Sequence, residues 1–463
     1  MSSRIPLTVN HAVDQGMAAA AVPPPPSLRS RALGLLVGAR PLASLFQAMS
    51  TQVIVIGINI LTGVLTARSL GPDGRGAFAA ITTWPQLLAT LATAGLNSAV
   101  IFRMRKAPEK SGAVAAAALL LSGTMSLVAI GVGVLLMPVW MARYSPAIVT
   151  FSQLCLASVV INSSQMMIKQ GFAGAGRFGQ FNLSQLLPQL LYLIGLVALI
   201  ALGAVTVQTA VLALLGGGAV AFLVTLVPFV RQVRPRLRPA FSELKPMVSY
   251  SVRAMLMDAV FVVATYADRI VLIPLLPIRE LGLYAVAFSF SRVIQLSQPA
   301  ITSVVFSHMA KAKEADSRVL HDRALRMLLV GLVVGCAVLW FAGAPLLRLA
   351  YGTEFSAANT IFRLLVIEAS LGALSQVTAQ LYLSHNRPGF VSTIQVCVLG
   401  ATLAALLLLV PAYGAKGAAI ALLAAGTVRW LCLLGGVSWV LGQRLPGLLL
   451  TRADLNYVIG KIR

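Results

Sequence analysis

Charged residues are scarce in this sequence, and acidic residues are the scarcest. Charged residues make up 11% of the 463 residues, with 13 Asp and Glu against 36 Lys and Arg, whereas a soluble globular chain carries about 25%. Hydrophobic residues make up 58%, and apolar runs long enough to cross a bilayer recur along almost the whole chain. The composition leaves little for a soluble domain and predicts an all-α polytopic membrane protein.

Motifs for catalysis and for cofactors are also lacking. The sequence contains no P-loop, no HExxH pair, no GxSxG elbow and no DxD-like acidic pair. The four cysteines lie inside apolar runs without metal-ligand spacing, so neither disulfides nor a metal site is expected. No outer loop is long enough to build an active site. We therefore expect transport by conformational change rather than catalysis, with no cofactor.

Twelve apolar runs are the expected membrane spans. Most basic residues fall in alternate loops, starting with the N-terminus, and this bias places those loops and both termini in the cytosol. The same bias accounts for the positive net charge, so nucleic acid is not an expected partner. The spans are 42–67, 76–102, 112–138, 146–168, 180–203, 208–230, 247–275, 281–307, 325–347, 355–383, 389–411 and 415–441.

The two halves of the chain read as copies of each other. Gly76 opens span two as Gly282 opens span eight, Arg177 follows span four as Arg387 follows span ten, and Gly203 precedes span six as Gly414 precedes span twelve. An even number of spans per copy gives both halves the same orientation, and transporters bind substrate between such halves. The expected organisation is a disordered cytosolic tail (1–41), an N-lobe (42–230), a basic linker (231–246), a C-lobe (247–441) and a cytosolic C-terminal tail (442–463).

The ionisable residues predicted inside spans all lie in the second half. Each costs roughly 2.5–3.5 kcal/mol near the bilayer centre, so they either form buried ion pairs or line a polar cavity. Span seven presents Ser251, Asp258, Thr265 and Arg269 on one face, and span eight presents Ser289, Arg292, Gln295, Pro299 and Thr302. Arginine suits phosphate because its planar fork donates paired hydrogen bonds, whereas carboxylates can bind a proton or sodium. The substrate-binding candidates are Arg253, Arg269, Arg292, Arg363, Arg429, Asn59 and Asn97, and the ion-coupling candidates are Asp258, Asp268 and Glu368.

Several segments of the chain form a series of family-like motifs. They are Leu70-Gly71-Pro72-Asp73-Gly74-Arg75-Gly76, Gly95-Leu96-Asn97, Gly171-Phe172-Ala173-Gly174-Ala175-Gly176-Arg177-Phe178 and Ala267-Asp268-Arg269 followed by Leu281-Gly282-Leu283-Tyr284-Ala285-Val286-Ala287. In their order and spacing they resemble the polysaccharide flippase family, which belongs to the multidrug/oligosaccharidyl-lipid/polysaccharide exporter superfamily. The resemblance covers about residues 42–441 and implies two six-helix lobes around a central cavity. It also implies movement of a polyprenyl-pyrophosphate-linked oligosaccharide from the cytosolic to the periplasmic leaflet, with spans one, two, seven and eight lining the cavity.

The leading hypothesis from the sequence is therefore a flippase of the bacterial inner membrane that serves surface or exopolysaccharide biosynthesis. Its expected partners are the lipid-linked oligosaccharide, a proton or sodium ion, membrane lipids and other polysaccharide export proteins. Two alternatives remain open. A multidrug or cation antiporter of the same superfamily would need an acidic cavity, and a membrane-embedded polysaccharide polymerase would need a large outer loop.

Overall fold

The computed structural model describes residues 28–295 and 314–447, which are helical throughout and contain no strand. Helices are expected here because a segment in lipid must satisfy its backbone hydrogen bonds internally. The described part of residues 1–47 is the beginning of the first helix. The cavities and side-chain contacts discussed below all lie in the described residues after Gln47.

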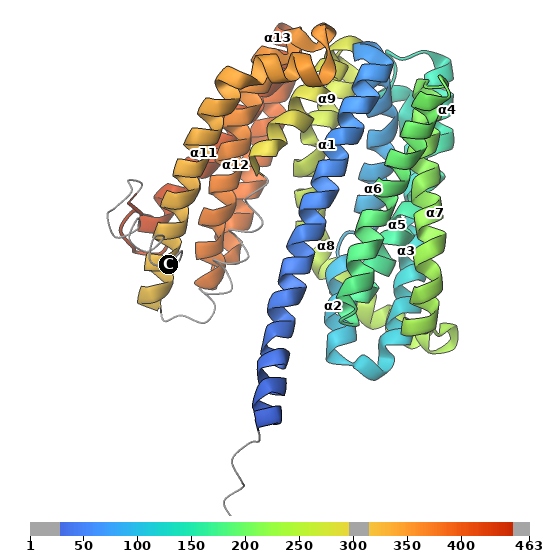
Figure 1. The fold of residues 1–463 in the computed structure, drawn as a ribbon, viewed down its shortest axis with the longest axis vertical. Coiled ribbons are helices and arrows are strands. Elements are labelled where there is room, and N and C mark those ends of the chain that lie inside the picture. The colour runs from blue at the N-terminus through green and yellow to red at the C-terminus, as the bar shows by residue number, and fades with distance from the viewer. Residues whose placement is uncertain (1–27, 296–313, 448–463) are drawn as a thin grey trace, which may run out of the picture. The chain divides into compact units, whose positions relative to one another are not determined.

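The first half of the chain consists of long helices joined by short connections. In Figure 1 the helices α3, α5, α6 and α7 run side by side, and α5 packs against each of the other three. The elements are α1 (Leu28–Ala92), α2 (Leu96–Lys106), η1 (Pro108–Lys110), α3 (Ser111–Trp140), α4 (Pro146–Cys155), α5 (Ser158–Gly174), α6 (Phe178–Ala201) and α7 (Val207–Val233).

The second half repeats this pattern. The helices α11, α12 and α13 lie side by side in Figure 1, and α12 packs against both of the others. The helix α8 contacts α2 and α3 of the first half as well as α9 and α13 of the second. The elements are α8 (Leu237–Leu275), α9 (Ile278–Ser291), η2 (Arg292–Gln295), α11 (Glu314–Tyr351), η3 (Thr353–Ala358), α12 (Asn359–Ser384) and α13 (Pro388–Trp439).

The number of spans follows from these helices. Eight helical segments of the described residues are long and apolar enough to cross a membrane. Two of them are each a pair of spans, because the left-handed backbone at Gly71 (φ 65°) and Gly414 (φ 59°) interrupts α1 and α13. The charged helix α8 and the short helix α9 occupy the places of spans seven and eight. The arrangement agrees with the prediction of about twelve spans.

The described boundaries refine the expected tails and linker. The helix α1 begins at Leu28, within the expected N-terminal tail, and only residues 234–236 of the expected 231–246 linker lie outside a helix. The later part of span eight, including Pro299 and Thr302, lies outside the described residues, as does much of the polar loop that follows it. The division into tails, lobes and linker stays a prediction.

The two halves meet at a pair of glycines. A Cβ atom on Gly76 would lie 1.9 Å from the carbonyl oxygen of Ile278, and a Cβ atom on Gly282 would lie 1.9 Å from the carbonyl oxygen of Pro72. The contact is reciprocal: each glycine approaches the backbone four residues before its counterpart. Only glycine allows two helices to approach this closely. Gly76 and Gly282 are also equivalent positions in the internal repeat of the sequence.

A second set of contacts between the halves joins α2 and η1 to the beginning of α8. The buried Glu243 carboxylate forms an ion pair with Arg103, and its Oε1 lies 3.4 Å from the Lys110 ammonium. The residue before Arg103 adds to this contact, since the ring of Phe102 stacks on Tyr250 with ring centroids 5.1 Å apart. These contacts explain why the first part of α8 lies against the helices of the first half.

Candidate functional site

A cavity of about 410 Å³ opens among the helices of the second half. It is bounded by α8, α9, η2, α12 and α13, and most of its polar lining comes from arginine, carboxylate and amide side chains. Such a mixture is unusual at membrane depth, where ionisable groups face a bundle interior or a water-filled space. The polar lining residues are Thr265, Asp268, Arg292, Gln295, Glu368, Gln376, Gln395 and Arg429.

An ion pair crosses this cavity. Nη2 of Arg292 lies 2.8 Å from Oε2 of Glu368, which joins the end of α9 to α12. The Glu368 oxygen is buried and accepts no well-aligned hydrogen bond within the described residues. Arg429 also lines the cavity, and its Nε is buried without a hydrogen-bond partner there. The two guanidinium groups of the cavity thus share the Glu368 carboxylate, since the other lining carboxylate, Asp268, accepts from the Tyr284 hydroxyl. This leaves donor capacity for an anionic ligand.

A smaller cavity of about 180 Å³ lies between α1 and the pair α8–α9. Arg75 and Arg269 line it from opposite halves of the chain, and no acidic residue is found among its described lining residues. The ring of Phe288 lines both cavities. The guanidinium carbons of Arg269 and Arg292 lie 5.2 Å and 4.2 Å from the centroid of that ring. Phe288 therefore supports two cations at once and links the two cavities.

The two aspartates of α8 are held by different groups. Asp268 is 3% exposed and accepts a 2.7 Å hydrogen bond from the hydroxyl of Tyr284. It nevertheless borders the larger cavity. Asp258 accepts a 2.8 Å hydrogen bond from the backbone N–H of Gly95, at the beginning of α2. A carboxylate at this position stabilises the positive end of the helix dipole. Asp258 therefore connects the two halves of the chain instead of lining either cavity.

Four further predicted residues lie away from both cavities. Arg253 is exposed and donates to the hydroxyl of Ser249 at 3.2 Å, whereas the guanidinium carbon of Arg363 stacks 4.9 Å from the ring of Trp340. Asn59 is exposed on α1, and the Asn97 side chain donates to the carbonyl oxygen of Thr93 at 3.3 Å, in the turn before α2. The structure thus brings together Arg269, Arg292, Arg429, Asp268 and Glu368.

Sequence reasoning missed two kinds of lining residue. Arg75 was assigned to an outer loop, but α1 resumes after Gly71 and carries its side chain into the smaller cavity. The polar positions Gln376 and Gln395 were not considered, although both lie in apolar runs where an amide is costly. The signal that could have found the two glutamines is the presence of an amide inside a predicted span, whereas Arg75 fell in a predicted loop and gave no such signal. Within the described residues, no group of His, Cys, Asp and Glu side chains is placed to hold a metal ion.

Comparison with known families decides the class of this molecule. The family of polysaccharide biosynthesis proteins matches residues 42–313, which is more than half of the chain. The chain belongs to this family. The resemblance to polysaccharide flippases of the exporter superfamily is thereby confirmed. No curated protein matches the chain in sequence with significance.

Solved structures of the same superfamily share the fold. The lipid II flippase MurJ in an inward closed conformation has a TM-score of 0.72 at 13% identity, covering 86% of this chain and 87% of its own. An inward-facing multidrug resistance MATE transporter has a TM-score of 0.68 at 15% identity, covering 84% and 95%. A transporter from Pyrococcus furiosus, described as having a binding pocket of reverse polarity, has a TM-score of 0.55 at 13% identity, covering 86% and 96%.

These matches establish the architecture. This chain is a multi-pass membrane protein with the two-lobe helical fold of this superfamily, as the sequence predicted. Its family and its structural neighbours are transporters and flippases rather than enzymes. At these identities the neighbours define the fold alone, so the cargo has to be argued from the cavities of this chain.

Proposed function

We propose that this protein carries a polyprenyl-pyrophosphate-linked oligosaccharide from the cytosolic to the periplasmic leaflet of the bacterial inner membrane, for surface or exopolysaccharide biosynthesis. The observation that supports this cargo is the excess of cations around the two adjoining cavities. Four arginines line them against two carboxylates, and one of those carboxylates is held by a tyrosine hydroxyl. The arginines are Arg75, Arg269, Arg292 and Arg429.

In this proposal the arginines hold the anionic part of the cargo. Guanidinium groups donate paired hydrogen bonds to pyrophosphate or to acidic sugars, and Arg269 and Arg292 are positioned for this by Phe288. The amides of Gln376 and Gln395 can donate to and accept from sugar hydroxyls. The cargo would then sit between an N-lobe (42–230) and a C-lobe (247–441), with both termini in the cytosol. Other polysaccharide export proteins would supply and accept the cargo.

An ion gradient would drive the cycle through the carboxylates. Glu368 and Asp268 border the larger cavity. Binding of a proton or a sodium ion to either carboxylate would make the net charge around Arg292 and Arg429 more positive. Asp258 would act at a distance from the cargo, because its charge supports the hydrogen bond between α8 and Gly95. Binding of a proton there would weaken a contact between the two halves. This links ion binding to alternating access.

The test compares arginine variants in a strain that lacks the chromosomal gene. We expect Arg269→Ala and Arg292→Ala to abolish polysaccharide export and to accumulate lipid-linked units on the cytosolic side. The matched control is Arg279→Ala, because Arg279 is exposed in the first turn of α9 and lines neither cavity. Full export by both cavity variants would refute the cationic-cavity proposal.

One observation favours a second candidate, a multidrug or cation antiporter. Two carboxylates, Asp268 and Glu368, border the same cavity, and cationic drugs need such groups. The arginines beside them argue against it, since they repel a cation at the same depth. Deletion of the gene with unchanged drug susceptibility would dismiss this candidate. Hypersensitivity to cationic drugs together with normal polysaccharide would establish it instead.

A further inference from the structure

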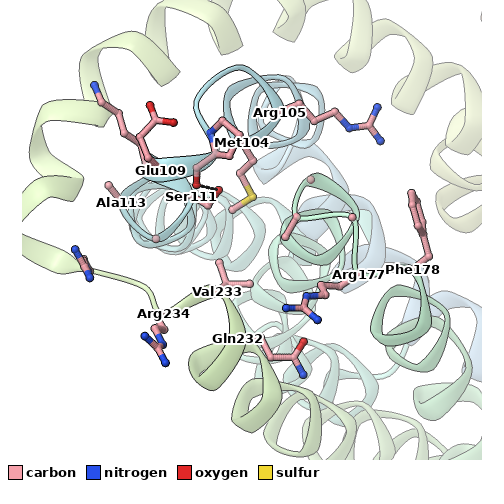
Figure 2. A pocket seen from close by; sticks show the side chains of 17 residues that line it. Met104, Arg105, Glu109, Ser111, Ala113, Arg177, Phe178, Gln232, Val233 and Arg234 are labelled. Carbon is pink, nitrogen blue, oxygen red and sulfur yellow. Dashed lines mark hydrogen bonds between the residues drawn. The ribbon is translucent and has the colours of Figure 1, made fainter. Parts of the chain in front are cut away.

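A cavity of about 820 Å³ is lined by none of the arginines of the candidate functional site. It is formed where three connections of the first half come together: α2–α3, α5–α6 and α7–α8. All three were predicted to face the cytosol. Figure 2 shows Arg105 at the end of α2, and Arg177 and Arg234 from the other two connections, at different positions around this cavity. We call it the connection cavity.

The charge around the connection cavity is strongly one-sided. Glu109 is the single acidic residue among the described residues that line it. The nearby Glu243 carboxylate is occupied by Arg103 and Lys110. Four lining arginines, all exposed, are left without an ion pair in the part of the chain that the structure describes. They are Arg105, Arg177, Arg234 and Arg236.

The orientation of the chain during membrane insertion explains why these connections are basic. It does not explain which of their basic residues line the cavity. The insertion rule depends on the number of Lys and Arg residues in a loop and not on where their side chains end up. Arg231 and Lys245 lie on the same predicted side and, like the lining arginines, are exposed, but they do not line the cavity. The insertion rule therefore does not explain why other basic side chains stand around one hollow.

The backbone at the cavity adds to its positive potential. Lys110 and Arg177 are the N-cap residues of α3 and α6, and neither side chain caps its helix. No acidic residue lies in the first turn of either helix. A cation at this position is the reverse of the usual preference, because the N-terminus of a helix already carries a partial positive charge. An anion bound in the cavity would offset both effects.

The wall of the connection cavity is fixed by backbone contacts. The N–H of Arg236 donates to the carbonyl oxygen of Gly112 at 3.0 Å, and a Cβ atom on Gly112 would lie 2.3 Å from the carbonyl oxygen of Arg234. Arg234 itself has a left-handed backbone, with φ 53°. This conformation is unfavourable for a residue other than glycine. The connection that carries two of the arginines is therefore held in place before any ligand arrives.

We propose that the connection cavity is a binding site for the phosphate groups of an anionic headgroup, at the end of the helices opposite the predicted periplasmic side. The cavity is large enough for more than one phosphate, and the arginines around it can donate paired hydrogen bonds to phosphate groups at different places along its rim. Basic pockets between helix ends on this side of a membrane commonly hold such headgroups. This site is separate from the cavities that would hold the transported cargo, so it does not depend on the proposed function.

The test measures binding to the purified full-length chain. The probes are mixed micelles containing cardiolipin, micelles containing only phosphatidylcholine, and soluble inorganic pyrophosphate. The variant Arg177→Gln/Arg234→Gln removes two lining charges, whereas Arg231→Gln/Lys245→Gln removes two charges from the same predicted side outside the cavity. A third variant, Arg177→Lys/Arg234→Lys, keeps the charge and loses the paired donors. Thermal unfolding without any probe checks that each variant is folded.

We expect the wild type to bind cardiolipin or pyrophosphate, and the variant Arg177→Gln/Arg234→Gln to bind about tenfold more weakly or worse. The control pair should bind as the wild type does, and the lysine pair should fall between the two. Binding of cardiolipin alone identifies a lipid headgroup, and binding of pyrophosphate identifies a phosphate site that does not need a lipid. Equal weakening by the cavity pair and the control pair would overturn the proposal, as would equal affinity for phosphatidylcholine micelles or no binding of either anion.

Discussion

Oδ2 of Asp258 accepts a 2.8 Å hydrogen bond from the backbone N–H of Gly95. Gly95 has a left-handed backbone (φ 74°) at the beginning of α2, and a Cβ atom there would lie 2.3 Å from the carbonyl oxygen of Ser251. The contact between the halves thus joins a glycine that cannot be replaced to a carboxylate that can be neutralised. Binding of an ion to Asp258 would therefore act directly on this contact between the halves.

Substitution of Asp258 should separate its structural effect from its charge. We expect Asp258→Ala to lose the hydrogen bond and to lower the free energy of unfolding by about 1.5–3 kcal/mol, the range for a bond to a charged group. Asp258→Asn keeps an acceptor and should lose less stability, but export should no longer depend on the ion gradient. Melting temperature and export are measured together, with Arg253→Ala on the same helix as the control. Gradient-dependent export by Asp258→Asn would contradict the coupling role.

The ion pair between Arg292 and Glu368 should show strong coupling between its partners. Arg292→Gln leaves a mostly buried carboxylate without its cation, so we expect a loss of about 1–3 kcal/mol in the free energy of unfolding. The double variant Arg292→Gln/Glu368→Gln removes both charges and should recover most of that loss. Export should stay defective in both variants, because both lack the arginine. A double variant that exports normally would show that the pair is structural only.

The glycine contact should tolerate no side chain. Gly76→Ala places a methyl group 1.9 Å from the carbonyl oxygen of Ile278, and we expect it to lower the free energy of unfolding by about 1–3 kcal/mol. Gly57→Ala is the matched control on the same helix, because a Cβ atom there meets nothing within 4 Å. That substitution should be neutral or stabilising, since alanine favours helix more than glycine does. Equal melting temperatures for the two variants would contradict the close approach.

Arg75 tests the part of the candidate site that the sequence did not reveal. Its Nε is buried without a hydrogen-bond partner among the described residues, and its guanidinium carbon lies 5.3 Å from the ring centroid of Phe78. We expect Arg75→Gln to reduce export while changing the free energy of unfolding by less than about 1 kcal/mol, because it forms no ion pair there. Export by Arg279→Gln should be normal. Normal export by Arg75→Gln would remove it from the proposed cargo site.

Most of the fold could be read from the sequence because hydropathy and loop charge report on single segments. The predicted spans 112–138, 180–203 and 208–230 differ from α3, α6 and α7 by a few residues at each end. The repeat could also be read, since Gly76 and Gly282 occupy equivalent places in the two halves. Breaks inside helices were harder to foresee. Span four divides into α4 and α5, and span two ends at Gly95 before α2.

The site could be predicted only in part, because the depth of a residue in the membrane does not determine which neighbouring helix its side chain faces. Arg292 and Arg363 were both read as intramembrane arginines, yet Arg292 borders a cavity and Arg363 stacks on Trp340. The difference depends on which neighbouring helix each one faces, and hydropathy does not contain that information. Arg75 shows the reverse case, since its position next to a glycine and a proline suggested a loop. Residues of this kind are identified by packing alone.

The reciprocal contact of Gly76 with Ile278 and of Gly282 with Pro72 has a consequence for the origin of the chain. When residue i of one body touches residue j of another and j touches i in return, the surfaces are self-complementary, as in an isologous dimer. The contact at these two glycines is therefore of the kind that two identical six-span polypeptides could make with each other. A single chain with two unequal halves could then specialise: one half gathers the membrane-embedded charges while the shared backbone contact keeps both halves together.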